Sequence, residues 1–248
     1  MPRCVVVIPC YNEAQRLRSD AFQSFAQMNP GIFFIFVNDG STDETSDVLN
    51  ALHSSLPGVT HVLECPSNGG KAEAVRRGMS YALDRIQPSI AGFWDADLAT
   101  PLDAILDFLR VLDSRPGIEM VFGARVKLLG RYIERNPVRH YLGRSFATVV
   151  STMLRMPIYD TQCGAKLFRV NPELQRVLRE PFLSRWIFDV EILARYIQLA
   201  NGDSTGLQAA IYEYPLTMWK DIAGSKIRAT DFFRAFIELG RIYRRYLT

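Results

Sequence analysis

The chain has 248 residues, of which 48% are hydrophobic and 22% charged, and its formal net charge is +3. This composition is typical of a folded protein with room for one α/β domain, and it excludes a disordered or low-complexity chain. The sequence pI of about 8.7 is only mildly basic and does not indicate a nucleic-acid-binding protein. No apolar run reaches the roughly 18 residues that a membrane-spanning helix needs, so we expect any membrane contact to be peripheral.

The first half of the chain repeats a unit of apolar strand, polar loop and amphipathic helix. Strands are expected at 4–8, 32–37, 59–64, 90–95 and 118–123. These segments are rich in Val, Ile and Phe and do not alternate with polar residues, as is usual for strands buried on both faces. The pattern predicts an α/β fold with a mostly parallel central sheet flanked by helices. Ligands bind such sheets outside the carboxyl ends of the strands, so the loops there are the expected functional site.

The rhythm changes after residue 125. An Arg-rich loop leads into a helix at 138–155, and a strand follows at 160–169. Helices are expected at 172–179 and 187–199, a strand at 207–215 and a last helix at 230–246. We find no linker long enough to separate two domains.

Two aspartates close the apolar run at 90–94. Asp95 and Asp97 are two residues apart, so their side chains point the same way if the strand continues through them. Carboxylate oxygens are the ligands that Mg²⁺ and Mn²⁺ prefer when they bridge to phosphate. The alternative is an ordinary solvated Asp-x-Asp turn.

The loops after the first two strands carry groups that suit a nucleotide. Tyr11 offers a ring for a base and Glu13 an acceptor, and Asp39 can accept from a base N–H or from ribose hydroxyls. For the second loop the structural alternative is a turn and a helix cap at Thr42 or Asp43.

The loop after the third strand, Asn68-Gly-Gly-Lys71, opens a helix. Backbone N–H groups, the helix dipole and the lysine all favour an anionic phosphate there. The loop lacks the GxxxxGK[ST] pattern of a P-loop, and Lys71 as a plain surface lysine is the alternative.

In this order, these loops resemble the GT-A fold of family-2 inverting glycosyltransferases. The downstream sequence is similar to the polyprenyl-phosphate branch, closest to dolichyl-phosphate glucosyltransferases and their bacterial relatives. The motifs that carry the resemblance are Asp95-Ala-Asp97-Leu-Ala-Thr-Pro, Asp160-Thr-Gln-Cys-Gly-Ala-Lys-Leu-Phe168, Arg185-Trp-Ile-Phe-Asp189-Val-Glu191, and Trp219 followed by Gly224-Ser-Lys226.

The resemblance implies transfer of a hexose, with glucose from UDP-glucose as the best candidate, to a polyprenyl (dolichyl or undecaprenyl) phosphate. It assigns the nucleotide to Pro9, Tyr11, Glu13, Asp39 and Lys71, and Mg²⁺ or Mn²⁺ to Asp95 and Asp97. Residues 1–124 would form the nucleotide-sugar-binding half and 125–215 the acceptor half of a 1–215 glycosyltransferase domain, followed by an amphipathic segment at 216–248. Ala99 departs from related mannosyltransferases, which carry Gln there, so we expect fewer protein ligands or more metal-bound waters at the cation.

Basic residues concentrate between the fifth strand and the next helix. Arg125 and Arg139 match family positions implicated in the acceptor phosphate, and Arg144 is a third candidate; the alternative is a solvated basic loop. A phosphate monoester is ionised near neutral pH, so no dedicated base is required. Relatives that use a sugar hydroxyl place an aspartate base in this region, where this chain has the carboxylates Asp160, Asp189 and Glu191. With a phosphate acceptor, structural or metal-side roles are expected for them.

The last expected helix is amphipathic. Its aromatic and apolar stripe faces away from its arginines, and it either docks on its own domain or lies at a membrane interface. The stripe consists of Phe232, Phe236, Leu239, Tyr243 and Tyr246, and the opposite face carries Arg234, Arg241 and Arg245. A lipid acceptor predicts a cytoplasmic protein, peripheral to the cytoplasmic face of a membrane, with a membrane-protein partner or a homo-oligomer as further alternatives.

Three other functions compete with this interpretation. A sugar nucleotidyltransferase also needs aspartates and phosphate-binding loops, but the chain lacks the Gly- and Arg-rich N-terminal signature expected of one. A glycosyltransferase that acts on a sugar hydroxyl would depend on a carboxylate base. A non-catalytic sugar-nucleotide-binding subunit of a membrane complex would bind the donor without turnover.

Overall fold

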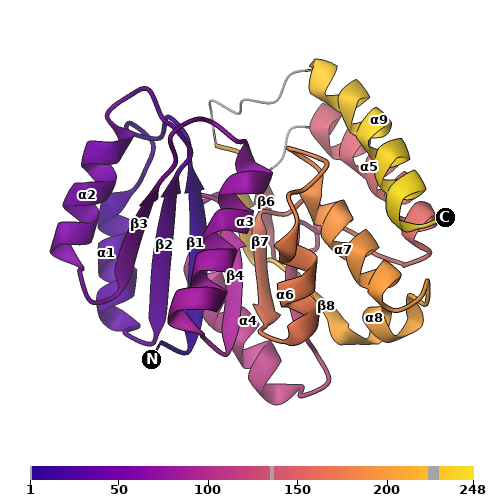
Figure 1. The fold of residues 1–248 in the computed structure, drawn as a ribbon, viewed down its shortest axis with the longest axis horizontal. Helices are drawn as coiled ribbons and strands as arrows, with labels where there is room; N and C mark the ends of the chain where they lie inside the picture. The colour runs from indigo at the N-terminus through magenta and orange to yellow at the C-terminus, as the bar shows by residue number, and fades with distance from the viewer. Residues whose placement is uncertain (1, 135–136, 223–228) are drawn as a thin grey trace.

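The computed structural model describes residues 2–134, 137–222 and 229–248, with 137–140 and 229–233 described by their backbone only (Figure 1). Seven strands form the main sheet, in the order β3-β2-β1-β4-β7-β5-β8. They are β1 (Cys4–Cys10), β2 (Ile32–Asn38), β3 (Thr60–Glu64), β4 (Ile90–Trp94), β5 (Met120–Ala124), β7 (Ala165–Arg169) and β8 (Ile211–Pro215). A small parallel sheet pairs β6 (Tyr132–Glu134) with β9 (Met218–Lys220).

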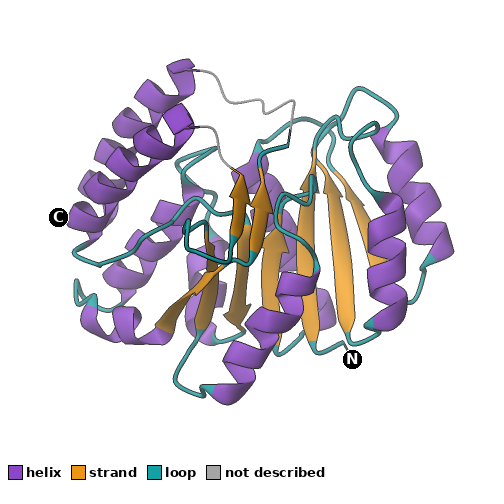
Figure 2. Ribbon diagram, turned by 180° about the vertical axis from the view of Figure 1, so that it is seen from behind, coloured by secondary structure: helices purple, strands orange, loops and turns teal. Residues whose placement is uncertain are grey.

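Helices cover both faces of the main sheet (Figures 1 and 2). They are α1 (Ser19–Met28), α2 (Thr45–Ser55), α3 (Lys71–Tyr81), α4 (Asp103–Ser114), α5 (Pro137–Leu154), α6 (Pro172–Arg179), α7 (Phe188–Leu199), α8 (Thr205–Ala210) and α9 (Ala229–Tyr246), with a π-helical turn η1 (Ala82–Ile86) after α3. Successive side chains of a strand point to opposite faces, so Val5 and Val7 of β1 pack towards α3 and α7, while Val6 and Ile8 pack towards α1 and α4. Burial on both faces explains why the strands carry no polar alternation.

Gly78 lets α3 approach the sheet closely. A Cβ at this position would lie 2.9 Å from a methyl carbon of Val37 and would overlap with Val7. This contact fixes the position of α3, whose first residues reach the functional edge of the sheet.

The predicted first five strands are confirmed within a few residues, and the mostly parallel sheet is confirmed with one antiparallel member. β7 runs antiparallel to both β4 and β5, between which it lies. The predicted strand at 160–169 is wrong in its first half, because 160–164 form a loop whose carbonyls at Thr161 and Cys163 accept from Lys166. The predicted strand at 207–215 is also wrong in its first half, where Leu, Gln and Ala are good helix formers and build the end of α8.

The last helix docks on its own domain, which is the first of the two alternatives stated for it. Leu239 and Ile242 of α9 are buried, and the ring of Phe236 packs edge-on to Phe146 of α5 with 5.9 Å between centroids. Figure 1 shows α5 and α9 side by side. Within the described ranges no helix combines the length and the apolar character needed to cross a bilayer. The side chain of Phe232 lies outside the described residues.

A buried ion pair ties α9 and α7 to the segment before α7. Glu191 is fully buried and forms an ion pair with the Arg195 guanidinium, which donates to its carboxylate. The same carboxylate accepts the backbone N–H groups of Leu183 and Ser184. It also accepts from the hydroxyl of Tyr246 in α9. Arg195 in turn donates to the carbonyls of Val177, Glu180 and Pro181. Glu191 therefore has a structural role, which is one of the two roles expected for it.

Glu191→Gln is expected to lower the free energy of unfolding by about 3 kcal/mol, because it leaves the Arg195 guanidinium buried without a charged partner. Urea denaturation measures the change. Glu173→Gln, on the exposed face of α6, is the matched control and should stay within about 0.5 kcal/mol of the parent protein. Equal midpoints for the two variants would contradict the role assigned to the buried pair.

Candidate active site

The predicted polar loops meet at one edge of the sheet, where the parallel strands β1 to β5 end. The first two of these loops are bonded to each other. Asn12 accepts from the Thr42 N–H at 2.8 Å, and the Glu13 N–H donates to the Thr45 hydroxyl at 2.8 Å. Asn12 has a positive φ of 51°, a conformation that Asn tolerates better than most residues. This places Pro9 and Tyr11 beside the Asp39 loop.

Asp39 binds the start of the next loop. Its two carboxylate oxygens accept the backbone N–H groups of Gly69 and Gly70, each at 2.8 Å. Burial raises the pKa of Asp39, and these two amides oppose the rise. The N–H groups that we expected to face a phosphate are thus bonded to the protein's own carboxylate. Asp39 keeps lone pairs for a second partner, since a carboxylate oxygen accepts more than one hydrogen bond.

Asp95 lies opposite Gly164 because β4 and β7 are antiparallel neighbours. Trp94 pairs with Ala165 in the sheet register, so the next residues along, Asp95 and Gly164, face each other. A Cβ on Gly164 would overlap with the Asp95 carboxylate. Lys71, at the first turn of α3, forms an ion pair with Asp95. The prediction that Lys71 and Asp95 share one site is therefore consistent with their positions.

Asp97 lies in the turn after Asp95. Its carboxylate accepts the backbone N–H of Ala99 at 3.0 Å, a bond that stabilises the turn. Burial and the charge of Asp95 raise the pKa of Asp97, while Lys71 and Arg16 oppose the rise. Leu98 has a φ of 53°, a strained conformation for a leucine at the point where the turn presents both aspartates.

The two aspartates suit a divalent cation. Their carboxylates are hard oxygen donors of like charge at one place. The Lys71 ammonium already forms an ion pair with Asp95, which shows that the site attracts positive charge. Mg²⁺ and Mn²⁺ are commonly held by one or two carboxylates while substrate phosphates and waters complete the coordination. In the part of the chain that the structure describes, no group of three or more His, Cys, Asp or Glu side chains is placed to hold a metal.

A second, buried ion pair lies behind Asp95. Lys166 of β7 is 1% exposed, and its ammonium contacts the Asp189 carboxylate of α7 at 2.5 Å. It also donates to the carbonyls of Thr161 and Cys163 and lies over the Phe93 and Phe122 rings. Burial raises the pKa of Asp189, and Lys166 and Lys71 oppose the rise. Lys166 thus holds the 160–164 loop that packs on Asp95.

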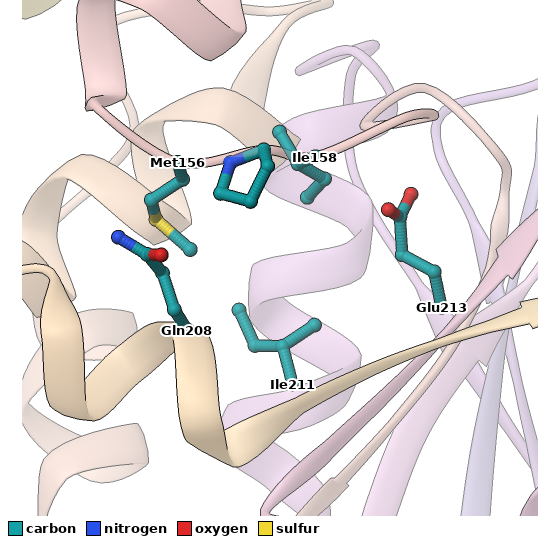
Figure 3. A pocket seen from close by; sticks show the side chains of 6 residues that line it. Met156, Ile158, Gln208, Ile211 and Glu213 are labelled. Carbon is teal, nitrogen blue, oxygen red and sulfur yellow. The ribbon is translucent and has the colours of Figure 1, made fainter.

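Arg125 pairs with Asp160 at the end of β5. Its Nε and Nη2 donate to the two carboxylate oxygens at 2.7 and 2.8 Å, and its guanidinium lies over the Trp219 ring. The bonds to Asp160 use Nε and Nη2 and leave out Nη1. A small pocket of about 120 Å³ lies next to the segment that leads to Asp160. Figure 3 shows that Met156, Ile158 and Glu213 are among the side chains that line it. There Glu213 accepts the N–H groups of Tyr159 and Asp160 at 2.8 Å and so orients the carboxylate that binds Arg125.

The remaining predicted acceptor residues stand differently. The side chain of Arg139 lies outside the described residues, so its role stays a prediction. Arg144 donates to the Tyr159 carbonyl at 3.0 Å and stacks over the Tyr159 ring. This places Arg144 against the loop that carries Asp160.

Sequence reasoning missed several residues that shape the site. Arg16 binds the Glu13 carboxylate with two nitrogens, so Glu13 holds an arginine that acts electrostatically on Asp97. The i, i+3 spacing of Glu13 and Arg16 was the available signal. Gly164, Lys166 and Arg185 stood in the family motifs without separate roles, because their partners are distant in sequence.

Solved structures of low sequence identity share this fold. Glucosyl-3-phosphoglycerate synthase from Mycobacterium tuberculosis, in complex with UDP, superposes with a TM-score of 0.66 at 18% identity over 98% of this chain and 80% of that one. A mannosyltransferase from Pyrobaculum calidifontis in complex with GDP-Man and Mn²⁺ gives a TM-score of 0.58 at 19% identity over 91% and 58% of the two chains. The likeness supports the GT-A fold.

Relatives found by sequence have a higher identity to this chain than these solved structures. The dolichyl-phosphate beta-glucosyltransferase of Dictyostelium discoideum is 32% identical, over 98% of this chain and 74% of that protein. The enzyme of the same description from Drosophila melanogaster is 34% identical over the same shares. The model of glycosyl transferase family 2 matches residues 5–172. The chain that carries this aspartate pair therefore belongs to glycosyl transferase family 2 and is a glycosyltransferase.

Proposed function

We propose that this enzyme transfers glucose from UDP-glucose to a polyprenyl phosphate, with Mg²⁺ or Mn²⁺ as cofactor. The observation that carries the proposal is the meeting of three ion pairs at one edge of the sheet: Lys71 with Asp95, Lys166 with Asp189 and Arg125 with Asp160. Relatives described as dolichyl-phosphate beta-glucosyltransferases align over nearly the whole chain, and a structural neighbour binds UDP-glucose and Mn²⁺.

The donor side consists of the first four loops. Tyr11 and Asp39 are assigned to the nucleoside, with Pro9 and Glu13 shaping the loop around them. Lys71 would exchange its contact with Asp95 for the donor diphosphate once Asp95 and Asp97 hold the cation. The cation supplies charge stabilisation for the departing nucleoside diphosphate.

The acceptor side uses a nucleophile that is already ionised. A phosphate oxygen attacks the anomeric carbon in line with the departing diphosphate, a glycosyl C–O bond forms as the old one breaks, and the configuration inverts. Arg125 and Arg139 are assigned to the acceptor phosphate. Asp189 is buried and bound to Lys166, which supports a structural role rather than that of a base.

Exposed apolar side chains support peripheral contact with the cytoplasmic face of a membrane. Leu128, Leu129 and Tyr132 follow Arg125 closely and are exposed, Leu129 fully. Further exposed apolar side chains lie on α5 and α9, with arginines nearby on α9 that suit anionic headgroups. They are Tyr141, Leu142 and Val149 on α5, and Phe236, Ile237 and Tyr243 on α9. A membrane protein or a second copy of the chain is the alternative partner for this surface.

The test is transfer of radiolabel from UDP-glucose into organic-extractable product, with undecaprenyl phosphate, detergent and Mn²⁺ or Mg²⁺. We expect labelled lipid, its loss with EDTA and its return with added metal. GDP-mannose in parallel tests the donor. Binding of UDP without labelled lipid, in detergent and in membranes, would favour a non-catalytic sugar-nucleotide-binding subunit.

Arg125→Lys tests the acceptor assignment. Lysine keeps the charge but loses the planar fork, so the KM for the lipid phosphate should rise about tenfold while UDP affinity is unchanged. Steady-state kinetics against the acceptor and calorimetry with UDP measure the two effects. Arg110→Lys on the exposed face of α4 is the control. An unchanged acceptor KM would reject Arg125 as a phosphate ligand.

A sugar-hydroxyl acceptor is the second candidate, because Asp189 lies near Asp95 and has a raised pKa. Asp189→Asn separates the two functions. With a phosphate acceptor, activity should persist in proportion to folded protein and should keep its pH profile. With a hydroxyl acceptor, kcat should fall and the acidic limb of the pH profile, which reports deprotonation of the base, should disappear.

A further inference from the structure

The loop at 68–72, which carries Lys71, is covered by a segment from far along the chain. We call residues 180–187 the strap. Arg185 of the strap donates through Nη2 to the side-chain oxygen of Asn68 at 2.6 Å and to its carbonyl at 3.3 Å. The Arg185 carbonyl accepts the Ala72 N–H at 3.4 Å. The strap therefore contacts the 68–72 loop at both of its ends.

Gly70 makes this contact geometrically feasible. It has a φ of +93°, and a Cβ there would lie 2.7 Å from the Arg185 Nε. The glycine thus allows both the turn and the close approach of the guanidinium. Gly69 and Gly70 donate to Asp39, and Lys71 pairs with Asp95. The residues that Arg185 contacts, Asn68 and Gly70, are therefore direct neighbours in the chain of Gly69, which binds Asp39, and of Lys71. Asp39 and Lys71 are both assigned to the donor.

The other side of the strap is fixed to the protein. The Ser184 hydroxyl donates to Glu238 of α9 at 2.5 Å and accepts the N–H groups of Trp186 and Ile187. Glu191 accepts the N–H groups of Leu183 and Ser184. These bonds hold the strap rigidly while Arg185 itself is solvent-exposed.

We propose that Arg185 is a positioning residue for the nucleotide-sugar donor: by binding Asn68, it holds the 68–72 loop in the conformation that presents Asp39 and Lys71 to the donor. This inference rests on the proposed function. Arg185 acts through Asn68 and is not assigned a contact with the donor.

A double-mutant cycle tests this role. UDP affinity is measured by calorimetry with Mn²⁺ for the parent chain, Arg185→Ala, Asn68→Ala and the double variant. Each single variant should bind UDP about tenfold more weakly, the usual cost of a hydrogen bond to a charged group. The double variant should lose clearly less than the sum of the two single losses, because both changes remove the bond from Arg185 Nη2 to the Asn68 side chain. The sum is the right comparison because Asn68→Ala also removes the bond from its side chain to the Asp39 carbonyl. Arg185→Lys, which keeps one bond, should be intermediate, and Arg179→Ala on the exposed face of α6 should match the parent chain.

Kinetics give a second readout. Arg185→Ala should raise the donor KM and leave kcat nearly unchanged, since the chemistry of the bound complex is intact. Additive losses in the double variant would overturn the proposal in favour of direct contact between Arg185 and the donor. Parent-like affinity of Arg185→Ala would overturn it outright, while the proposed function would stand if the parent chain binds UDP. A parent chain that does not bind UDP would overturn both.

Discussion

Asp97→Asn should reduce glucosyl transfer by about 100- to 1,000-fold, because it removes one of the two carboxylates that hold the cation beside the leaving diphosphate. Asparagine preserves the size of the side chain and can still accept the Ala99 N–H, so the turn is expected to keep its shape. The effect should therefore appear in catalysis and not in stability. Radiolabel transfer and thermal denaturation, measured on the same preparations, separate the two.

Asp103→Asn is the matched control for this change. Asp103 begins α4 a few residues after Asp97 and is exposed, so its variant should transfer glucose at the parent rate. Raising the Mn²⁺ concentration should recover part of the activity of Asp97→Asn if weaker metal binding is the cause. An Asp97→Asn variant with parent activity would remove the metal from the proposed mechanism.

Gly164→Ala is expected to lower activity by about 100-fold, since a shift of about 1 Å in a catalytic group can have that effect. The added methyl group would overlap with the Asp95 carboxylate, so either Asp95 or the 160–164 loop must move. Both movements disturb the metal site, and the second also disturbs the carbonyls that bind Lys166. Transfer kinetics over a range of Mn²⁺ concentrations should show a weaker apparent metal affinity.

Gly206→Ala provides the control for the glycine replacement. Gly206 lies in α8, and a Cβ there meets nothing within 4 Å. This variant should keep full activity and gain slightly in stability, because alanine loses less backbone entropy in a helix than glycine. Equal activity of the two alanine variants would show that Asp95 tolerates a side chain opposite it and would contradict the site geometry.

The strands and the aspartate pair were predictable because their signals are local. Runs such as Val5 to Ile8, which are apolar without alternation, are typical of strands buried on both faces, and Asp95 and Asp97 follow directly after such a run. The final helix was predicted from its periodicity, but only the structure shows that Leu239 is buried and that Tyr246 bonds to Glu191.

Pairings between distant residues were not predictable from one sequence. Nothing near Gly164 indicates that it faces Asp95, because that contact follows from β7 running antiparallel beside β4. Similarly, Arg185 and Asn68 are 117 positions apart, and Arg125 meets Asp160 across 35. The basic cluster suggested a phosphate site, but it gave no sign that the Arg125 fork is shared with a carboxylate. Long-range pairing also decides where β7 begins, so residues 160–164, predicted as strand, form a loop.

The position of β7 limits how this enzyme can be re-engineered. A chimera joined at residue 124 would take the sheet strand between β4 and β5 from one parent and both of its neighbours from the other. Every backbone hydrogen bond across that strand, and the fit of Gly164 to Asp95, would then have to be compatible between the parents. Exchange of short surface loops, with β7 and its neighbours kept from one parent, is the more promising route to a changed acceptor preference.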